Sequence, residues 1–378
     1  MPTWGRAVSR PFLPMIGILG AAYCLLALLL ALVDPLALYP WGISPRLKTD
    51  GDYSMESTPY LVDAAAKDPG VDTLFIGGST GHSYTPRMME EILPNTRRAF
   101  NLSYGAPSAS DRAVVQRQIL RYSHARRFIL EADWGYVIPA RGQHAAPSFP
   151  LYLYDDKWWN DVRDVNSQIV ELSLAVLGGN PLWISPWGKA DEQETFRNRY
   201  RANHSTAFLA RYAAMISRRR AGVDAPSELT CDAMDTIGAS LVPWVRALSQ
   251  RGARVDLVVP PYSWLIYYRA REPGDPINRP SLLSEVLTMR RCVVRALEGL
   301  PGVSVFAFDD VPAIGGDFGN FMDVGHLHNP AVNRYILQSI ANGEHRLTPD
   351  NIEAKNEEMR SNVVQYRLTA DQIGIPGE

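Results

Sequence analysis

One serine of this chain lies in a sequence context typical of a nucleophile. Residues 71–76 form a short apolar run that predicts a β-strand, and Ser79 follows it within the sequence Gly-Gly-Ser-Thr-Gly of residues 77–81. A strand that runs into glycines and then a serine places the hydroxyl at the carboxyl edge of a sheet, where open α/β folds bind ligands. The same residues match G-x-S-x-G, the sharp turn that exposes a nucleophilic serine. A glycine-rich turn with a capping serine accounts for the motif equally well, so both interpretations stay open at this point.

Two residues near the other end of the chain supply the base that such a serine needs. Asp323 and His326 lie three positions apart, directly before a helical pattern that begins at Asn329-Pro330. A carboxylate on the same loop can fix the tautomer of the imidazole while the other ring nitrogen faces the serine. An adjacent base activates a serine hydroxyl, so these residues predict acyl-transfer chemistry. His328 is close enough to be confused with the base, but the spacing favours His326.

Other interpretations of these residues fit the sequence less well. A phosphate-binding loop requires a lysine after its second glycine, and none follows here. A metal site made of Asp323, His326 and His328 has no further ligand with convincing spacing, so we expect neither a metal nor another cofactor. In the α/β-hydrolase fold the nucleophile usually follows a strand in the middle of the sheet, and the acid and the histidine lie on separate loops.

The motifs resemble those of the SGNH (GDSL-like) hydrolase superfamily over about residues 70–345. The resemblance rests on a serine after the first strand, a glycine after the second, and Asp-x-x-His before the last helix. It implies a flavodoxin-like sandwich in which Ser79 is the nucleophile, His326 the general base and Asp323 the acid that orients it. It also implies that the backbone N–H groups of Ser79 and Gly105 bind the oxyanion of the tetrahedral intermediate.

Two positions depart from the pattern of this superfamily. Gly78 stands where GDSL-type members carry an aspartate. The third block normally supplies an asparagine side chain to the oxyanion hole, whereas Asp133 follows the third predicted strand here. An ionised Asp133 cannot donate a hydrogen bond, and the loss of one donor can cost on the order of a hundredfold in rate. The activity is therefore expected to be slow, specialised or absent.

Alternating strand and helix patterns predict an α/β three-layer sandwich around a five-stranded parallel sheet. Apolar runs that are typical of strands covered on both faces occupy residues 71–76, 98–102, 127–131, 255–259 and 303–308. Helical patterns occupy residues 61–67, 86–93, 110–122, 237–250, 281–300 and 330–342, with Ser110 expected to cap the third and Asn329 the last. The catalytic domain is assigned to residues 71–345 with a helical, tryptophan-rich insertion at 140–234, and the polar residues 346–378 are expected to form a C-terminal surface extension.

The N-terminal region predicts a membrane anchor. Residues 11–33 contain no charged side chain and are numerous enough to cross a bilayer, while the apolar part of a cleaved signal peptide is normally shorter. Arg6 and Arg10 directly precede this run, and the first basic residues after it are Arg46 and Lys48. Residues 1–10 are therefore expected to be a cytoplasmic tail and residues 34–70 a tether. This predicts a single-pass protein of a bacterial inner membrane with its catalytic domain in the periplasm.

The charge balance and the cysteines restrict the class of protein further. The 38 basic and 40 acidic residues give a net charge of −2, which argues against a nucleic-acid partner. Hydrophobic residues make up 46% of the chain, enough for a substantial core. Of the three cysteines, Cys24 lies in the apolar run, so Cys231 and Cys292 are the only pair that could bridge. A disulfide between them is not expected.

Membrane-anchored SGNH-like proteins with a substituted third block resemble bacterial enzymes that add or remove O-acyl groups on surface polysaccharides, such as periplasmic alginate acetyltransferases. The resemblance implies serine-dependent O-acyl transfer, with acetyl as the expected acyl group, or ester hydrolysis on an exported polysaccharide. A membrane-bound protein could supply the acyl group. The candidate substrate contacts are His82, Trp134 and Tyr262. A catalytically silent polysaccharide-binding or scaffold subunit of an export complex, and a lipid or small-ester hydrolase, stay open as alternatives.

Overall fold

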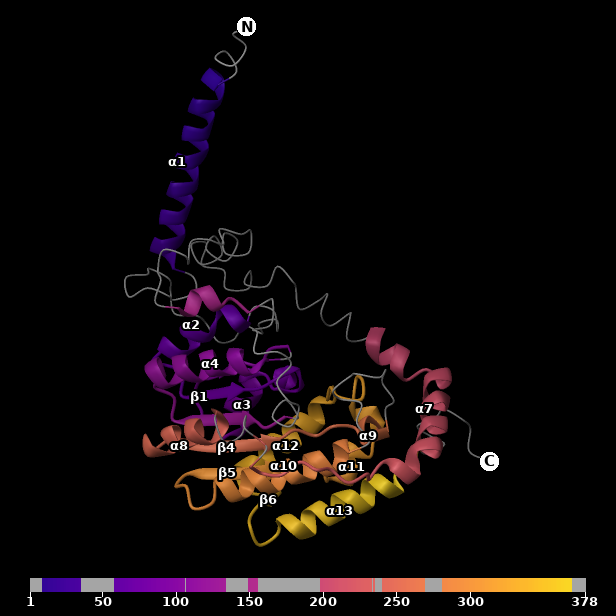
Figure 1. Ribbon diagram of the computed structural model, residues 1–378. Coiled ribbons are helices and arrows are strands. Elements are labelled where there is room, and N and C mark those ends of the chain that lie inside the picture. Colours follow the sequence, from indigo (N-terminus) through magenta and orange to yellow (C-terminus); the bar gives the residue numbers. More distant parts are fainter. Residues whose placement is uncertain are drawn as a thin grey trace.

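A mixed β-sheet lies at the centre of the computed structural model, which describes residues 9–34, 58–105, 107–133, 149–155, 198–232, 234, 240–268 and 281–368 (Figure 1). The sheet has six strands in the order β2-β1-β3-β4-β5-β6. Their bounds are β1 Thr73–Ile76, β2 Ala99–Asn101, β3 Arg127–Glu131, β4 Arg254–Val259, β5 Val303–Ala307 and β6 Arg346–Leu347. The first five are parallel, as predicted, and β6 is antiparallel to β5. The sheet therefore has one strand more than the five that were predicted.

Successive strand residues enter two separate hydrophobic cores, because side chains alternate between the faces of a sheet. Leu74 belongs to one core, whereas its neighbour Phe75 belongs to the other. In the same way Leu257 and Val258 of β4 are both buried, but in different cores. Burial on both faces explains why the strand sequences are apolar without alternation.

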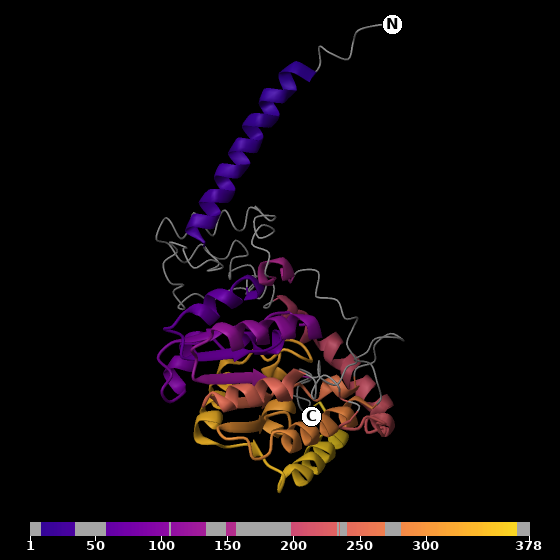
Figure 2. The same cartoon turned by 60° about the vertical axis from the view of Figure 1, so that its left-hand side comes forward.

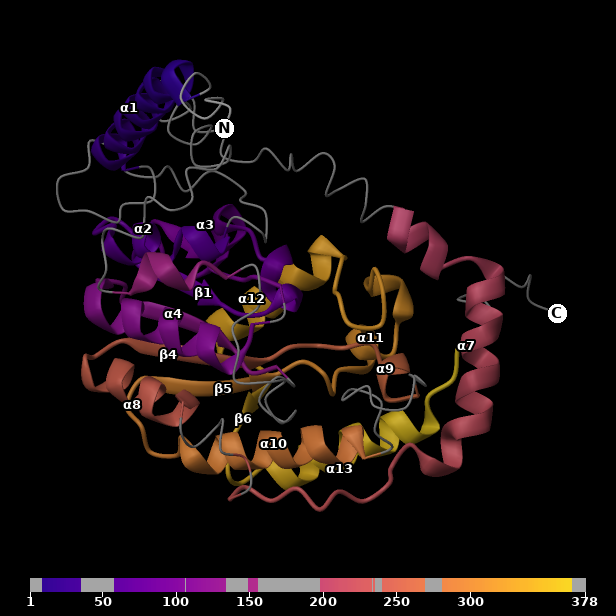
Figure 3. The same cartoon turned by 45° about the horizontal axis from the view of Figure 1, so that its top comes forward.

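Helices cover both faces of the sheet (Figures 1 and 3). The first core includes residues of α2, α4 and α8, and the second includes residues of α3, α12 and α13. The α-helices of the domain are α2 Val62–Lys67, α3 Pro86–Ile92, α4 Ala109–Tyr122, α7 Thr206–Arg219, α8 Val242–Gln250, α9 Leu265–Tyr268, α10 Leu282–Ala296, α11 Pro312–Gly315, α12 Pro330–Asn342 and α13 Ile352–Gln365. Short 3₁₀ helices are η1 Thr58–Tyr60, η2 Ser79–Ser83, η4 Leu151–Tyr154, η7 Arg220–Gly222 and η9 Phe318–Asn320.

Two helix caps test the sequence predictions directly. The predicted cap Ser110 of α4 is wrong, because Ser108 accepts the backbone N–H of Asp111 and the Asp111 carboxylate accepts that of Ser108. This reciprocal pair satisfies two N–H groups that a first turn leaves free, which a serine at position 110 would not do. The cap of α12 is confirmed: Asn329 accepts the backbone N–H of Ala331 at 3.0 Å.

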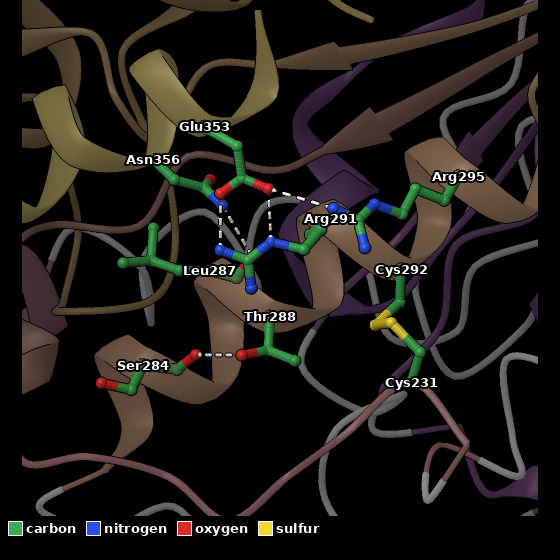
Figure 4. Close-up of a disulfide and its surroundings, with 9 residues drawn as sticks. All are labelled: Cys231, Ser284, Leu287, Thr288, Arg291, Cys292, Arg295, Glu353 and Asn356. Atoms are coloured by element: carbon green, nitrogen blue, oxygen red, sulfur yellow. Dashed lines mark hydrogen bonds and ion pairs between the residues drawn. A yellow bond between two sulfur atoms is a disulfide. The ribbon is translucent and has the colours of Figure 1, made fainter. Parts of the chain in front are cut away.

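The C-terminal region packs into the domain. The prediction of a surface extension is wrong for residues 346–368, which contain β6 and α13, while residues 369–378 lie outside the described part. Ile352, Met359 and Val363 form a narrow buried stripe on α13. The Asn356 side chain also donates to the backbone oxygen of Leu287 in α10, at 2.9 Å (Figure 4). The sequence did not predict this packing, because α13 is polar overall and only a few of its residues are apolar and face the core.

A disulfide joins Cys231 to Cys292, so the expectation that these residues do not pair is wrong (Figure 4). Their Cα atoms are 5.3 Å apart although 61 positions separate them in the sequence. Cys292 lies on α10, and residue 231 comes from the extended segment that follows η7. The sequence alone could not show that this segment returns along α10.

The helix α1 (Ser9–Val33) extends away from the globular part as a single rod (Figures 1 and 2). Residues Pro14–Val33 have a mean hydropathy of 2.6 and are almost entirely exposed. The helix is long and apolar enough to cross a bilayer, as predicted. Of the predicted insertion at 140–234, the structure describes residues 149–155, 198–232 and 234.

Candidate active site

The nucleophile loop, residues 77–81, leaves the carboxyl end of β1 with two glycines that the packing requires. A Cβ on Gly77 would lie 2.6 Å from Glu131 Oε2, and one on Gly78 would lie 2.8 Å from Asp133 Oδ2. Any larger residue at either position would collide with a carboxylate at the carboxyl end of β3, that of Glu131 or of Asp133. The next residue, Ser79, begins η2 and is half-buried. The absence of an aspartate at position 78, noted from the sequence, thus has a steric reason.

Ser79, His326 and Asp323 form one hydrogen-bonded chain. His326 Nε2 lies 2.9 Å from Ser79 Oγ, and His326 Nδ1 lies 2.8 Å from Asp323 Oδ1. The same carboxylate oxygen accepts the backbone N–H of Gly325 at 2.9 Å and that of His326 at 3.0 Å. Since a carboxylate can only accept, we assign the proton of the neutral imidazole to Nδ1. Nε2 is then free to accept the proton of Ser79.

The loop that carries Asp323 and His326 is closed on itself. Phe321 and Leu327 form an antiparallel bridge, and the N–H of Met322 donates to the backbone oxygen of His326 at 2.8 Å. The loop leads directly into α12, whose first turn Asn329 caps. The imidazole is therefore fixed by its own backbone as well as by the carboxylate, as a preorganised base requires.

The Asp323 carboxylate is stabilised in its charged form. Burial raises its pKa, but the hydrogen bond and charge of His326, the N–H of Gly325 and the cation of Arg199 together lower the pKa to about 2. Arg199 Nη1 lies 3.6 Å from Asp323 Oδ2 and stays largely exposed. Asp323 is thus ionised throughout the neutral range and can stabilise an imidazolium.

Residues 199–204 of the predicted insertion lie against the loop that carries Asp323 and against η9. Asn203 donates from its side chain to the backbone oxygen of Met322 at 3.0 Å. His204 stacks on Phe318 with ring centroids 4.5 Å apart, and its Nε2 lies 3.2 Å from the Phe318 oxygen. Together with the ion pair of Arg199, these contacts hold residues 199–204 beside Asp323. The sequence did not indicate a role for Arg199, Asn203 or His204, because no pattern showed that this part of the insertion lies against the loop of Asp323.

Glu131, the last residue of β3, contacts the nucleophile loop on both sides of the serine. Its Oε2 accepts the N–H of Gly78 at 2.7 Å, and its carboxyl also hydrogen-bonds the Thr80 side chain. Desolvation by complete burial, reinforced by the nearby Asp133 carboxylate, raises the pKa of Glu131 to about 8. The sequence signal for this group is a charged residue at the carboxyl end of a strand whose middle residues, 128–130, are apolar.

Asp133, at the position of the missing third-block asparagine, is held by an ion pair. Arg112 Nη2 on α4 donates to both carboxylate oxygens of Asp133, at 2.9 Å each. Both side chains are about nine-tenths buried. A carboxylate in this arrangement accepts hydrogen bonds and cannot donate one to an oxyanion.

Gly105 follows β2 in the stretch that runs alongside the nucleophile loop. The N–H of Tyr104 donates to the backbone oxygen of Gly77 at 3.4 Å. Asn101 ties the same region to η2, because its side chain donates to the oxygens of Gly81 and Tyr84 at 2.9 and 2.7 Å. Gly105 itself is exposed, and a Cβ there would meet no atom within 4 Å.

The candidate substrate residues are placed differently from one another. His82 lies on η2, three residues after Ser79, and is half-buried. Tyr262 is only 2% exposed and belongs to the second hydrophobic core, so it packs in the interior. Trp134 lies outside the described residues, as do Trp158, Trp159, Trp183 and Trp187 of the insertion.

A pocket opens beneath the nucleophile loop on the side of α4 and α8. Its lining residues are Ile76, Gly77, Tyr104, Pro107, Arg112, Val115, Gln116, Leu130, Glu131 and Trp244. Ser79 and His326 do not line it. Over the described ranges, no group of three or more histidine, cysteine or acidic side chains is arranged to hold a metal ion. His328 packs with its ring centroid 5.7 Å from that of Tyr200.

No family model matches the chain, and no curated protein matches it significantly. The proposed function therefore rests on the fold and on the geometry of the site.

Proposed function

We propose that the protein is a serine-dependent O-acyltransferase or esterase that works through an acyl-serine intermediate. The observation that carries this proposal is the continuous Ser79–His326–Asp323 chain, with contacts of 2.9 and 2.8 Å. Ser79 lies on the loop that follows β1, and Asp323 and His326 lie on the loop that precedes α12. Ser79 and His326 are 247 positions apart in the sequence. This is the arrangement that nucleophilic acyl transfer needs.

In the proposed mechanism, Ser79 Oγ attacks the carbonyl carbon of an ester while His326 Nε2 accepts the hydroxyl proton. The imidazolium is stabilised by the Asp323 carboxylate and then returns the proton to the leaving alcohol. The acyl-serine is resolved by a second alcohol or by water, which His326 deprotonates in turn. Transfer and hydrolysis differ only in this acceptor, so the triad serves both.

The backbone N–H groups of Ser79 and Gly105 are the proposed oxyanion donors. The contact of Tyr104 with Gly77 brings the segment before Gly105 to the nucleophile loop, which supports this assignment. The Arg112–Asp133 pair removes the third donor that the SGNH superfamily uses. A two-donor hole predicts slower acylation than a complete one.

The strand order supports membership of the SGNH superfamily. Five parallel strands in the order β2-β1-β3-β4-β5 follow the flavodoxin-like pattern, in which ligands bind where the order reverses beside β1. Ser79 follows β1, at this switch point. In an α/β-hydrolase the nucleophile and its two partners would be distributed over three loops, whereas Asp323 and His326 share one.

We further propose that the catalytic domain is anchored to a bacterial inner membrane and faces the periplasm. The helix α1 supplies the anchor, and the basic residues that precede it favour a cytoplasmic N-terminus. The Cys231–Cys292 disulfide supports export, because disulfides persist in oxidising compartments and are rare in the cytosol. An exported polysaccharide is then the proposed acyl acceptor or ester substrate, and a membrane-bound protein the proposed donor.

The proposal is tested with the full-length protein in detergent micelles. Purified chain is incubated with an activated acetyl ester, with and without oligosaccharides of surface polysaccharides. Acetylated sugar or free acetate should accumulate in a reaction that Ser79→Ala and His326→Ala both abolish. If neither product forms above the rate of the two variants, the catalytically silent binding or scaffold subunit replaces this proposal.

A further inference from the structure

Glu131 is a buried carboxyl that the mechanism above does not use. It is the final residue of β3 and is 2% exposed. One oxygen, Oε2, is occupied by the N–H of Gly78 at 2.7 Å, and the carboxyl also contacts the Thr80 hydroxyl. The residues directly before and after the proposed nucleophile are therefore both attached to one side chain.

The surroundings of the second oxygen of Glu131, Oε1, favour a protonated carboxyl group. Within the described part of the chain Oε1 is buried and has no hydrogen-bond partner. A buried carboxylate with one unsatisfied oxygen is costly, and a neutral carboxylic acid in the same place costs much less. Among the charged groups around it, Asp133 repels a negative charge on Glu131 more strongly than Arg112 attracts one, because Arg112 is paired with Asp133. The buried phenol of Tyr84 is neutral.

We propose that Glu131 is a positioning residue that sets the working pH range of the site. Its neutral acid holds Gly78 and Thr80, and therefore Ser79, in the reactive geometry. Loss of the Oε1 proton to solvent at alkaline pH places a negative charge beneath the nucleophile loop and slows acylation. The inference rests on the proposed function, since it concerns the reactivity of Ser79.

The direction of this effect follows from electrostatics. Attack by Ser79 creates an oxyanion near the backbone N–H groups of the loop, and a carboxylate beneath that loop repels it. At an effective dielectric constant of about 20 and a separation of roughly 7–10 Å, the repulsion slows acylation on the order of tenfold or more. The raised pKa of about 8 places the change within a range where most proteins stay folded.

The first measurement compares the rate of fluorophosphonate labelling against pH in the full-length protein and in Glu131→Gln. The parent rate should fall about tenfold above pH 8, and this alkaline fall should be absent in Glu131→Gln. The variant Thr80→Val removes a hydrogen bond that favours the charged form, so the midpoint of the fall should move to higher pH. Glu90→Gln is the matched control. Glu90 also accepts a backbone N–H, from Ala99, but Ala99 is at the amino end of β2, whereas Glu131 is at the carboxyl end of β3. Its profile should keep the alkaline fall.

The second measurement does not depend on catalysis. Infrared difference spectra should contain the carbonyl band of a protonated carboxyl group that disappears as the pH rises through about 8. The band should be missing in Glu131→Gln and retained in Ser79→Ala. Absence of the band, or an alkaline fall that persists in Glu131→Gln, would overturn the proposal. A parent protein that is never labelled would instead contradict the proposed function, while the infrared band would still decide whether Glu131 carries the proton.

Discussion

Both carboxylate oxygens of Asp133 accept hydrogen bonds from Arg112 Nη2, at 2.9 Å each. This ion pair lies at the position where the resemblance to the SGNH superfamily predicts an oxyanion donor. It also explains why position 78 is glycine, because a Cβ there would lie 2.8 Å from Asp133 Oδ2. The departures at positions 78 and 133 are therefore one structural feature.

Asp133→Asn should destabilise the protein, because it removes the partner of the buried Arg112 guanidinium. Removing one partner of a buried ion pair costs about 3 kcal/mol of unfolding free energy, because the other charge stays buried. In the double variant Arg112→Gln/Asp133→Asn much of that loss should be recovered, since no buried charge remains. Thermal unfolding of the four proteins of this cycle measures the coupling. Additive effects of the two single substitutions would show that the pair carries no coupling energy.

Gly78→Ala should disable the site, whereas Gly105→Ala should leave it working. A Cβ at position 78 would collide with Asp133, but one at position 105 would meet no atom within 4 Å. Alanine at position 105 also keeps the backbone N–H that is proposed to bind the oxyanion. Labelling of Ser79 by a fluorophosphonate should fall at least about tenfold in Gly78→Ala. Equal labelling of the two variants would contradict this description of the nucleophile loop.

Protonation of Asp323 should not limit activity until the solution is strongly acidic. The pKa of Asp323 is lowered to about 2, below its ordinary value, so folding favours the ionised form. The resulting contribution to stability is complete above about pH 4 and is lost as the pH falls through about 2. Asp323→Asn removes this pH dependence and the acceptor for Nδ1–H, and should slow labelling by about 10²–10⁴.

The check on Asp323 is unfolding by denaturant at pH 5 and pH 3, with Asp323→Asn beside the parent chain. Between these values the parent should lose more stability than the variant. A parent and a variant that change equally would show that the carboxylate is not stabilised by its neighbours.

Reduction of the Cys231–Cys292 bridge should destabilise the domain by about 4 kcal/mol, as the chain-entropy relation gives for a loop of 61 positions. The double variant Cys231→Ser/Cys292→Ser should have an unfolding midpoint lowered by the same amount as a reductant lowers that of the parent chain. A reductant that leaves the parent unchanged, or that also shifts the double variant, would contradict a structural bridge.

The sequence predicted what depends on local patterns. A parallel sheet, the cap at Asn329 and the grouping of Ser79 with His326 all followed from motifs and periodicity. The structure confirms the cap and a mostly parallel sheet, which has six strands instead of five. The geometry also brings the serine, histidine and aspartate together. These features are set by short segments, each of which carries its own signal.

What the sequence did not predict depends on contacts between distant segments. The helix α13 buries so few apolar residues that its sequence is polar overall, and Cys231 returns along α10 through an extended segment. Arg199 and Asn203 reach the catalytic loop from an insertion without periodic pattern. The proposed role of Glu131 rests on the burial of its second carboxyl oxygen, which residue spacing in the sequence does not reveal.

The most direct test of the central claim is the site of covalent labelling. Full-length protein is treated with a fluorophosphonate at neutral pH, and the adduct is located by peptide mass analysis beside Ser79→Ala, His326→Ala and the neighbouring control Ser83→Ala. We predict one adduct, on Ser79, that is retained in Ser83→Ala and lost in the other two variants. The absence of any adduct under conditions that label an established serine esterase, or labelling that survives in His326→Ala, would contradict a serine activated by this histidine.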